Sequence, residues 1–234
     1  MKLAIMQPYF FPYLGYWQLI HAVDRFVVYD DVNYIKSGWI NRNRILINGV
    51  ATYITVPLYQ SSSYKRICDT QLQTFIKWSD KLLKKIENTY KKTPYFTETF
   101  PIIEKIILYK TDNLADFLAN QLIELSKLMN LDTEIVLTSR IYENHQLSGQ
   151  ERVIDICKRE KTNIYLNAIG GQTLYDSKTF KDAGIELQFI EMKPFSYPQK
   201  STEFVPYLSI IDVLMNVGVE GVKEHLNAFE LKTN

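Results

Sequence analysis

The chain of 234 residues is 46% hydrophobic and 23% charged, a composition typical of a globular protein with enough apolar material to bury a core. Its formal net charge of +1 lacks the basic excess that binding to nucleic acid or to a membrane surface requires, which argues against both partners. No segment has the roughly 20 consecutive apolar residues of a membrane span, and no signal peptide is evident.

The two cysteines, Cys68 and Cys157, lack the spacing of a metal site or of a secreted disulfide framework. We therefore expect reduced thiols and a cytoplasmic location. The three histidines show no zinc-site spacing, so no metal site is predicted from them. A site in which carboxylates bind a divalent ion is an open alternative.

The N-terminal part predicts a strand, a loop and a helix. The apolar run over residues 3–6 predicts a buried strand, and an amphipathic helix is expected to end near Val23. Residues 7–20 (QPYFFPYLGYWQLI) join them through a loop with an unusual load of aromatic rings and prolines. A helix N-terminus after such a loop presents unpaired N–H groups and a positive dipole end, so we expect it to hold a phosphate or nucleotide.

Residues 25–30 predict a second strand that ends on two carboxylates, Asp30 and Asp31. A polar and aromatic loop follows over residues 31–43. Residues 44–47 and 52–56 flank Asn48 and Gly49, a pair that tolerates positive φ at both positions and therefore favours a two-residue hairpin turn.

Helices and strands alternate over the rest of the chain, and Pro94 and Pro101 interrupt its helical middle. The expected elements are helices over 75–90 and 114–129, a strand over 134–137, a helix over 150–158, a strand over 164–166, a helix over 177–183, a strand over 186–190, and a helix over 208–217 ended by Gly218. Strands separated by helices at both ends of the chain predict an α/β fold. We expect one domain over residues 1–234, a mostly parallel, Rossmann-like sheet in which residues 75–130 form a helical insertion.

The first candidate site lies in the N-terminal loop, where the ligand-binding candidates are Gln7, Tyr9, Tyr13, Gly15 and Tyr16. This segment resembles the start of the nucleotidyltransferase-like (HUP) branch of the Rossmann group, with tyrosines at both histidine positions of that branch's motif. A tyrosine of ordinary pKa donates only a neutral hydrogen bond, which supports nucleotide binding better than adenylyl transfer. The alternative is that these rings simply pack beneath the loop.

The second candidate site follows the second strand. Asp30, Asp31 and Lys36 are the candidate catalytic residues, because a carboxylate can accept a proton from an attacking amine. The candidate substrate-binding residues here are Trp39, Asn41, Arg42, Asn43 and Arg44. Arginine binds phosphate through a planar fork of donors, and we expect this loop to meet the first one at a shared crevice. The alternative is a solvated loop that only connects two strands.

Weaker signals occur late in the chain. Gly170 and Gly171 follow a strand with Asn167, and paired glycines let backbone approach a ligand closely, although a turn explains them equally well. The polar and aromatic loop over residues 195–206 adds Glu203 to the candidate binding residues. Asp212 lies among apolar neighbours, so we expect it to be paired with an arginine or with backbone N–H groups.

With these segments assembled, the chain resembles the WbqC-like family nearly from end to end. The resemblance rests on residues 7–20, the Asp30–Asp31 pair, residues 38–45 (GWINRNRI), residues 90–96 and residues 208–218 (LSIIDVLMNVG). Members of this family are associated with bacterial gene clusters for surface polysaccharides, including O-antigen and unusual amino sugars. The resemblance therefore implies a role in sugar-nucleotide metabolism.

Three functions are compatible with these observations. The first is an enzyme that transfers an acyl or aminoacyl group to the amine of a nucleotide-linked amino sugar in O-antigen biosynthesis. The second is ATP-dependent activation of a small carboxylic acid. The third is a catalytically silent protein that binds a sugar nucleotide. The expected partner is thus a small molecule, a sugar nucleotide. The cofactor is unknown, with a nucleotide as the candidate, and a homodimer is an open alternative.

Overall fold

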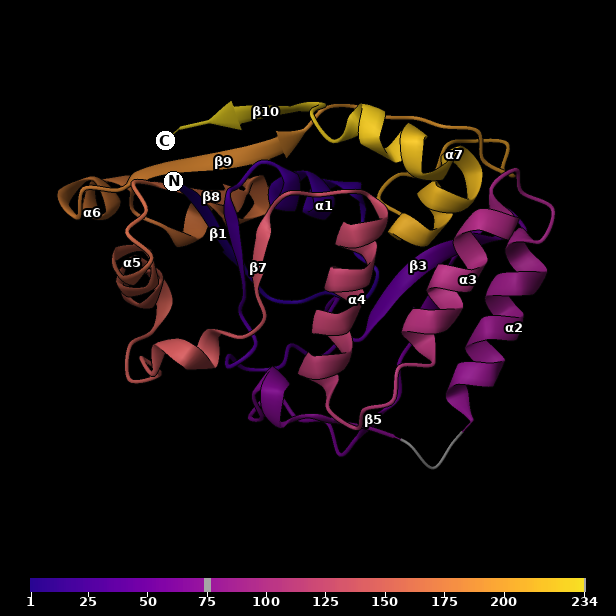
Figure 1. Cartoon of the computed structure of the whole chain (residues 1–234), viewed down its shortest axis with the longest axis horizontal. Helices are drawn as coiled ribbons and strands as arrows, with labels where there is room; N and C mark the ends of the chain where they lie inside the picture. Colours follow the sequence, from indigo (N-terminus) through magenta and orange to yellow (C-terminus); the bar gives the residue numbers. More distant parts are fainter. Residues whose placement is uncertain (74–76, 234) are drawn as a thin grey trace.

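The computed structural model describes residues 1–73 and 77–233, and in these residues a six-stranded sheet forms the centre of the molecule (Figure 1). Its strands stand in the order β10-β9-β8-β1-β2-β7. Every neighbouring pair is parallel except β9 and β10. The strands are β1 (Lys2–Met6), β2 (Arg25–Val28), β7 (Glu134–Val136), β8 (Ile164–Ala168), β9 (Glu186–Met192) and β10 (Phe229–Lys232). The expected mostly parallel α/β sheet is confirmed.

Both faces of the sheet are covered, which explains why β1, β2 and β8 are largely apolar. Along β1, Leu3 and Ile5 point to one face and Ala4 to the other. The Leu3 face packs against α5 (Gly149–Arg159) and α6 (Ser177–Asp182). The Ala4 face packs against α1 (Leu14–His21) and α7 (Ile210–His225).

The strand order has a reversal point between β1 and β8. Strands β2 and β7 lie on one side of β1, and β8 and β9, which follow later in the chain, lie on its other side. In open parallel sheets, ligands bind outside the carboxyl ends of the strands at such a point. The loops that begin at Gln7 and Ile169 leave the sheet there.

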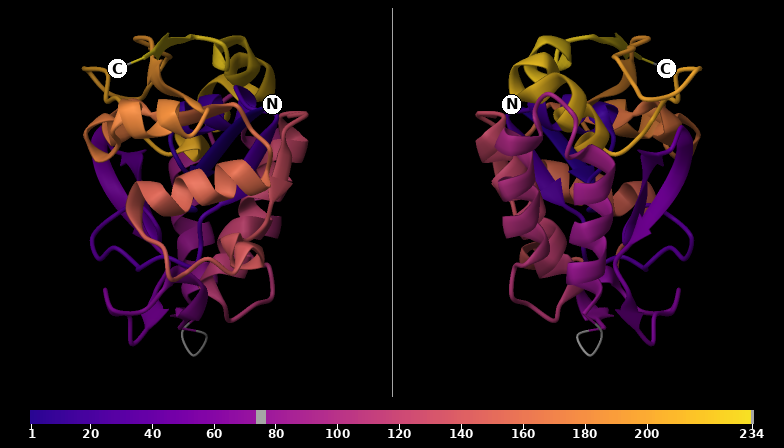
Figure 2. Two further views of the ribbon diagram at one scale, coloured as in Figure 1. Left: turned by 90° about the vertical axis from the view of Figure 1, so that its left-hand side faces the viewer. Right: turned by 90° about the vertical axis from the view of Figure 1, so that its right-hand side faces the viewer.

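The predicted hairpin is confirmed and forms a separate layer. Strands β3 (Arg42–Ile47) and β4 (Val50–Thr55) pair antiparallel, and Asn48 and Gly49 both have positive φ, 51° and 77°. Figure 2 shows this hairpin at the back of the molecule as viewed in Figure 1. Two short strands, β5 (Leu58–Tyr59) and β6 (Gln71–Leu72), follow it.

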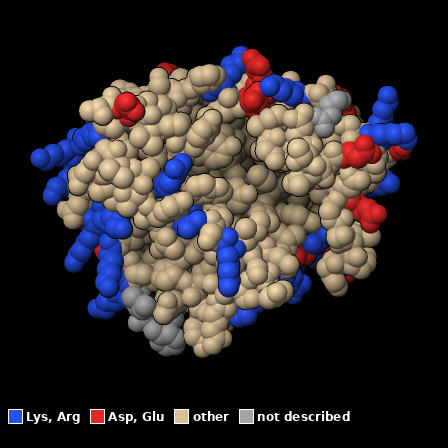
Figure 3. Space-filling model, turned by 180° about the vertical axis from the view of Figure 1, so that it is seen from behind, with Lys and Arg blue, Asp and Glu red and all other residues tan. Residues whose placement is uncertain are grey.

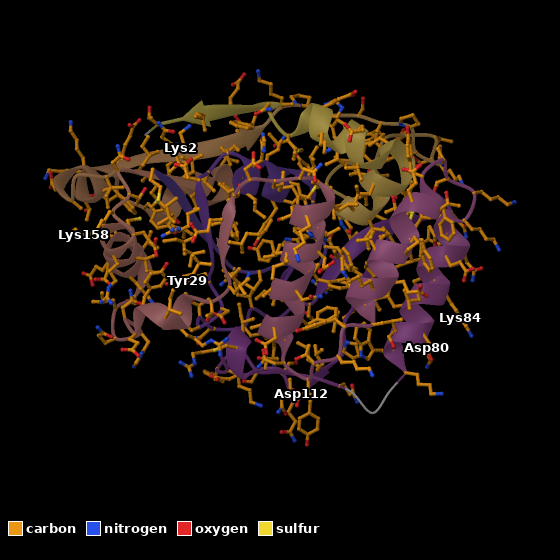
Figure 4. The ribbon with its side chains drawn as sticks, in the orientation of Figure 1. Lys2, Tyr29, Asp80, Lys84, Asp112 and Lys158 are labelled. Carbon is orange, nitrogen blue, oxygen red and sulfur yellow. The ribbon has the colours of Figure 1, made fainter. Side chains whose placement is uncertain are left out.

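Three helices fill the middle of the chain between these strands and β7. They are α2 (Trp78–Tyr90), α3 (Phe96–Ile107) and α4 (Leu114–Leu128). The expected start of the first helix at residues 75 and 76 lies outside the described residues. Helix α2 buries Leu82 and Ile86 and turns Asp80 and Lys84 to solvent (Figure 4).

Helix α3 was not predicted, because Pro101 was interpreted as a break. A proline inside a helix removes one backbone hydrogen bond, normally to the carbonyl four residues earlier. Here that carbonyl belongs to Thr97, an exposed residue, so water can replace the lost partner. The apolar stripe of Ile103, Ile106 and Ile107 is fully buried and keeps the helix in place.

Three further details differ from the expectations. Helix α1 is not amphipathic, since every residue from Leu14 to Ile20 is buried. Gly218 does interrupt the last helix, with φ 72° and ψ −175°, but helical structure resumes and continues to His225. Strand β10 was missed because a four-residue edge strand leaves almost no pattern. Within the described residues, no helix has the length and apolarity needed to cross a bilayer.

Candidate ligand-binding site

The N-terminal loop is fixed by two buried phenylalanines and a buried glutamine. Phe10 and Phe11 are fully buried in the core. Gln121 of α4 accepts a hydrogen bond from the Phe11 N–H (2.8 Å) and donates one to the Tyr9 carbonyl (3.0 Å). This bidentate clamp on the backbone leaves the neighbouring tyrosines, Tyr9 and Tyr13, only partly buried. The packing interpretation of the loop is correct for the phenylalanines, and Tyr9 and Tyr13 also pack against the core while keeping part of their surface exposed.

The second loop lies directly against the first. The Phe10 N–H donates to the Trp39 carbonyl (2.9 Å), and the amide of Asn43 donates to the carbonyls of Phe10 (3.0 Å) and Phe11 (2.8 Å). Ser209, just before α7, also donates to the Phe11 carbonyl (2.8 Å). Segments far apart in the chain thus fix one another through backbone carbonyls.

A pocket of about 270 Å³ lies where these loops meet, and we call it the Arg44 pocket. Its lining is Tyr9, Pro12, Tyr13, Trp39, Asn43, Arg44 and Tyr207. None of these lining residues carries a carboxylate, and Arg44 carries the positive charge among them. The hairpin lies on the face of the molecule drawn in Figure 3, which is hollowed near its centre. Lysine and arginine side chains lie beside and below this hollow, and acidic side chains lie above it.

Arg44 is the most informative residue of this pocket. Its Nε is buried and has no hydrogen-bond partner among the described residues. Its guanidinium carbon lies 5.6 Å from the centre of the Trp39 ring, a cation–π arrangement. Arg44 is a candidate anion-binding residue because it carries the positive charge among the residues that line the pocket.

The tyrosines at this end of the molecule stay neutral. Burial raises the pKa of Tyr9, Tyr13 and Tyr16, most strongly for Tyr16. The Tyr16 hydroxyl donates to the Gln7 carbonyl (2.9 Å), so Tyr16 shapes the loop from beneath and does not line the Arg44 pocket. A Cβ at Gly15 would come within 2.5 Å of the Tyr13 ring, so the glycine makes room for that ring.

The two carboxylates belong to a different cluster. Asp30 accepts hydrogen bonds from the Thr138 hydroxyl (2.8 and 2.9 Å) and the Ser139 N–H (3.0 Å), and Arg140 lies 3.2 Å from it. Burial raises the pKa of Asp30, and these bonds work in the opposite direction. Neither Asp30 nor Asp31 lines the Arg44 pocket.

Asp31 forms a buried ion pair with Arg152 of α5, at 2.5 Å. Arg152 is also held by Asn144 (2.9 Å) and lies over the ring of Tyr29, 5.0 Å from its centre. Tyr29 is labelled in Figure 4, where it projects from the end of β2 toward the α5 side. These contacts connect the end of β2 to α5 and indicate a structural role for the Asp31–Arg152 pair. A catalytic role for Asp30 or Asp31 stays a prediction.

The remaining residues of the second loop have separate tasks. Lys36 is exposed to solvent. Asn41 is buried, accepting from the Tyr34 hydroxyl (2.7 Å) and donating to the Val56 carbonyl (2.8 Å). Arg42 donates to the carbonyls of Ser37 and Gly38 and lies over the ring of Tyr53. Arg42 therefore has hydrogen-bond acceptors among the described residues, whereas the Nε of Arg44 has none.

The late candidates also lie outside the Arg44 pocket. Asn167 donates to the Tyr165 hydroxyl (3.2 Å) and accepts from the Ala168 N–H (2.7 Å). A Cβ at Gly171 would touch the Asn167 side chain at 3.1 Å, whereas Gly170 faces open space. Glu203 is exposed, and its backbone carbonyl accepts from Ser201 (2.6 Å). Binding roles for these residues stay predictions.

Asp212 does not pair with an arginine. It accepts hydrogen bonds from the hydroxyls of Tyr90 (2.5 Å) and Tyr197 (2.7 Å), with a further contribution from the backbone of Leu46. Burial raises its pKa. The expected backbone contact is present, but two tyrosines take the place of the expected cation.

Two positions of the candidate site were missed from the sequence. Tyr207 lines the Arg44 pocket, and Gln121 positions the loop that forms its wall. The aromatic loop ending at Pro206 was the available signal for Tyr207. Gln121 left none, because it is one polar residue in an otherwise ordinary amphipathic helix. In residues 1–73 and 77–233, no group of three or more His, Cys, Asp or Glu side chains is arranged to hold a metal ion.

Comparison with known proteins identifies the family. A protein of Mycobacterium tuberculosis that carries only the name Uncharacterized protein Rv1507c is 26% identical over 222 residues, which cover 94% of this chain and 95% of that protein. No solved structure matches significantly. The model of the WbqC-like protein family matches residues 7–224, a span that includes both loops of the Arg44 pocket and most of α7. The chain belongs to the WbqC-like protein family.

Proposed function

We propose that this protein binds a nucleotide-linked amino sugar in the Arg44 pocket and acts in the biosynthesis of bacterial surface polysaccharides such as O-antigen. We further propose a Rossmann-like, nucleotidyltransferase-like relationship for its sheet. The reaction that fits best is transfer of an acyl or aminoacyl group to the amine of the sugar.

One observation carries the binding part of this proposal. Arg44 is a partly buried, planar donor and carries the positive charge among the residues that line a pocket with aromatic walls. A guanidinium binds phosphate oxygens in a bidentate manner. Trp39 and Tyr9 offer flat faces for a base or sugar, and Asn43 offers an amide beside them. An arginine beside aromatic walls suits a nucleoside diphosphate better than a simple carboxylic acid.

The transfer step makes definite demands on the site. An N–C bond forms between the amine and the acyl carbon of an activated donor such as a thioester. The bond to the leaving group breaks with its electron pair, and the amine loses a proton. That proton needs an acceptor, and neither Asp30 nor Asp31 lines the Arg44 pocket. This observation favours, as second candidate, a protein that binds the sugar nucleotide without transforming it.

Calorimetric titration distinguishes binding from its absence. UDP-, dTDP- and GDP-linked amino sugars are titrated into the wild type and into Arg44→Ala. Arg66→Ala is the matched control, because Arg66 is exposed, pairs with Asp69 and does not line the pocket. We expect at least one of these ligands to bind the wild type and the control, and to bind Arg44→Ala much more weakly. Equal affinity in all three proteins, or no binding by any ligand, contradicts the proposal.

Mass spectrometry then separates the two candidates. The ligand that binds is incubated with the protein and acetyl-CoA, and with other short-chain acyl thioesters. A sugar nucleotide heavier by the acyl group identifies a transferase. Binding without any new mass across the thioester series supports the non-catalytic candidate.

A further inference from the structure

A second pocket adjoins the Arg44 pocket. It encloses about 290 Å³ between the start of α1, the segment after β9 and the loop before α7, and we call it the Phe195 pocket. The two pockets share two lining residues, Tyr13 and Tyr207. Phe195, Phe204 and Leu208 give the second pocket mostly aromatic and aliphatic walls.

Tyr207 lies between the two pockets in an unusual backbone conformation. Its φ is +56°, in the left-handed region that bulky side chains rarely occupy. Its ring meets that of Tyr13 edge to face, with centres 5.9 Å apart. The side chain is 60% exposed, so burial recovers little of the backbone strain. Strain that stability does not explain is concentrated at ligand clamps and active sites.

The walls of the Phe195 pocket indicate what it can accept. Lys193 is the cation among its lining residues, and no carboxylate is among them. An apolar group gains free energy there in proportion to the surface that it removes from water. Apart from Lys193, the walls named above are aromatic or aliphatic, which suits a short acyl chain.

We infer that the Phe195 pocket is the subsite for the short apolar acyl group of the donor, and that Tyr207 separates it from the nucleotide-binding subsite. The inference rests on the proposed function for the identity of the ligand in the Arg44 pocket. Transfer between neighbouring groups requires both reactants to be held close together, and the shared wall of Tyr13 and Tyr207 provides that proximity.

Two residues allow the pockets to be observed separately in one sample. Met192 lines the Phe195 pocket, and Trp39 lines the Arg44 pocket. The protein is labelled with ¹³C in its methionine methyl groups and with ¹⁵N in its indoles. The probes are UDP and the soluble thioester S-butyryl-N-acetylcysteamine. We expect UDP to shift the Trp39 indole resonance and the thioester to shift the Met192 methyl resonance, each in a saturable manner.

A blocking variant and its matched control complete the test. Pro194 is exposed and lines the Phe195 pocket, so Pro194→Trp places a bulky ring at its rim. Pro198 is exposed in the same segment but lines neither pocket, so Pro198→Trp is the control. We expect Pro194→Trp to weaken thioester binding at least fivefold while UDP binding is retained, and Pro198→Trp to change neither.

The possible failures are distinguishable. If UDP shifts Trp39 while the thioester leaves Met192 unchanged or shifts it without saturation, the inference is overturned and the nucleotide site stands. The same holds if Pro194→Trp binds the thioester as the wild type does. If the thioester titrates Met192 while UDP leaves Trp39 unchanged, the acyl subsite is supported and the nucleotide proposal fails.

Discussion

The guanidinium of Arg44 lies over the ring of Trp39, with Cζ 5.6 Å from the ring centre, while its Nε remains buried without a hydrogen-bond partner among the described residues. The cation–π contact holds the guanidinium at the pocket wall, where it is the positive charge among the lining residues. This pair joins the loop before the hairpin to the hairpin itself, so the pocket is formed before any ligand arrives.

Replacing Arg44 should reduce binding without unfolding the protein. A hydrogen bond to a charged group contributes about 1.5–3 kcal/mol, so Arg44→Ala should weaken the binding of a nucleotide roughly 10- to 150-fold. Arg44→Lys should recover only part of this loss, because an ammonium lacks the planar fork. Calorimetry measures the affinity, and thermal melting checks the fold. Full affinity in Arg44→Lys would show that only charge matters.

Gly15→Ala should separate stability from binding. Alanine is favoured over glycine inside helices by about 1 kcal/mol, and Gly15 lies in the first turn of α1. The added methyl would come within 2.5 Å of the Tyr13 ring and must displace it. Since Tyr13 lines both pockets, we expect nucleotide affinity to fall several-fold at nearly unchanged melting temperature. A strongly destabilised variant would show that the ring cannot move.

The Asp31–Arg152 pair should matter for stability. Removing one partner of a buried ion pair leaves an uncompensated charge and costs about 3–5 kcal/mol. Both Asp31→Asn and Arg152→Ala are therefore expected to lower the free energy of unfolding by about this amount, as denaturant titration can measure. The control is Asp69→Asn, which breaks an exposed pair that contributes about 1 kcal/mol or less. An Asp31→Asn protein of wild-type stability would restore the catalytic interpretation of that carboxylate.

Asp212 should make stability depend on pH. Burial raises its pKa above the ordinary value of 3.8, so the folded protein holds this proton more tightly than the unfolded chain does. The wild type should therefore lose stability as pH rises above about 4, until the folded-state pKa is passed. Asp212→Asn removes this titration. Melting curves between pH 4 and 8 should show the wild type falling relative to Asp212→Asn, but not relative to Asp80→Asn on the exposed face of α2.

Tyr207→Gly should relieve backbone strain. A non-glycine residue in the left-handed region costs about 1–2 kcal/mol, and the exposed Tyr207 ring returns little of it. We expect a melting temperature equal to or above that of the wild type, with weaker binding of both UDP and the butyryl thioester. A clear drop in melting temperature would mean that the ring stabilises the fold and that the strain needs no functional explanation.

The sequence predicted elements whose signal is local. The apolar run of β1 and the Asn48–Gly49 turn determine their own geometry, and both were confirmed. Helix α3 was missed because its stabilising contacts are tertiary and outweigh the effect of Pro101. Strand β10 depends on pairing with β9, which a short edge segment does not encode by itself.

The same distinction explains the candidate site. Arg42 and Arg44 are two residues apart on β3 and look equivalent in the sequence. The loop carbonyls of Ser37 and Gly38 accept from Arg42, whereas no such group reaches the Nε of Arg44. The fold of the loop over residues 31–43 therefore decides which arginine is bound by backbone carbonyls and which lines the pocket. The position of Tyr207, 163 residues after Arg44 in the chain, depends on long-range packing in the same way.

The most direct measurement is a crystal structure of the protein soaked with UDP. The account predicts diphosphate oxygens within about 3.2 Å of the Arg44 guanidinium, with the nucleotide seated between Tyr9, Tyr13 and Trp39. A nucleotide bound elsewhere on the molecule, or an Arg44 pocket that stays empty at saturating UDP, would contradict it.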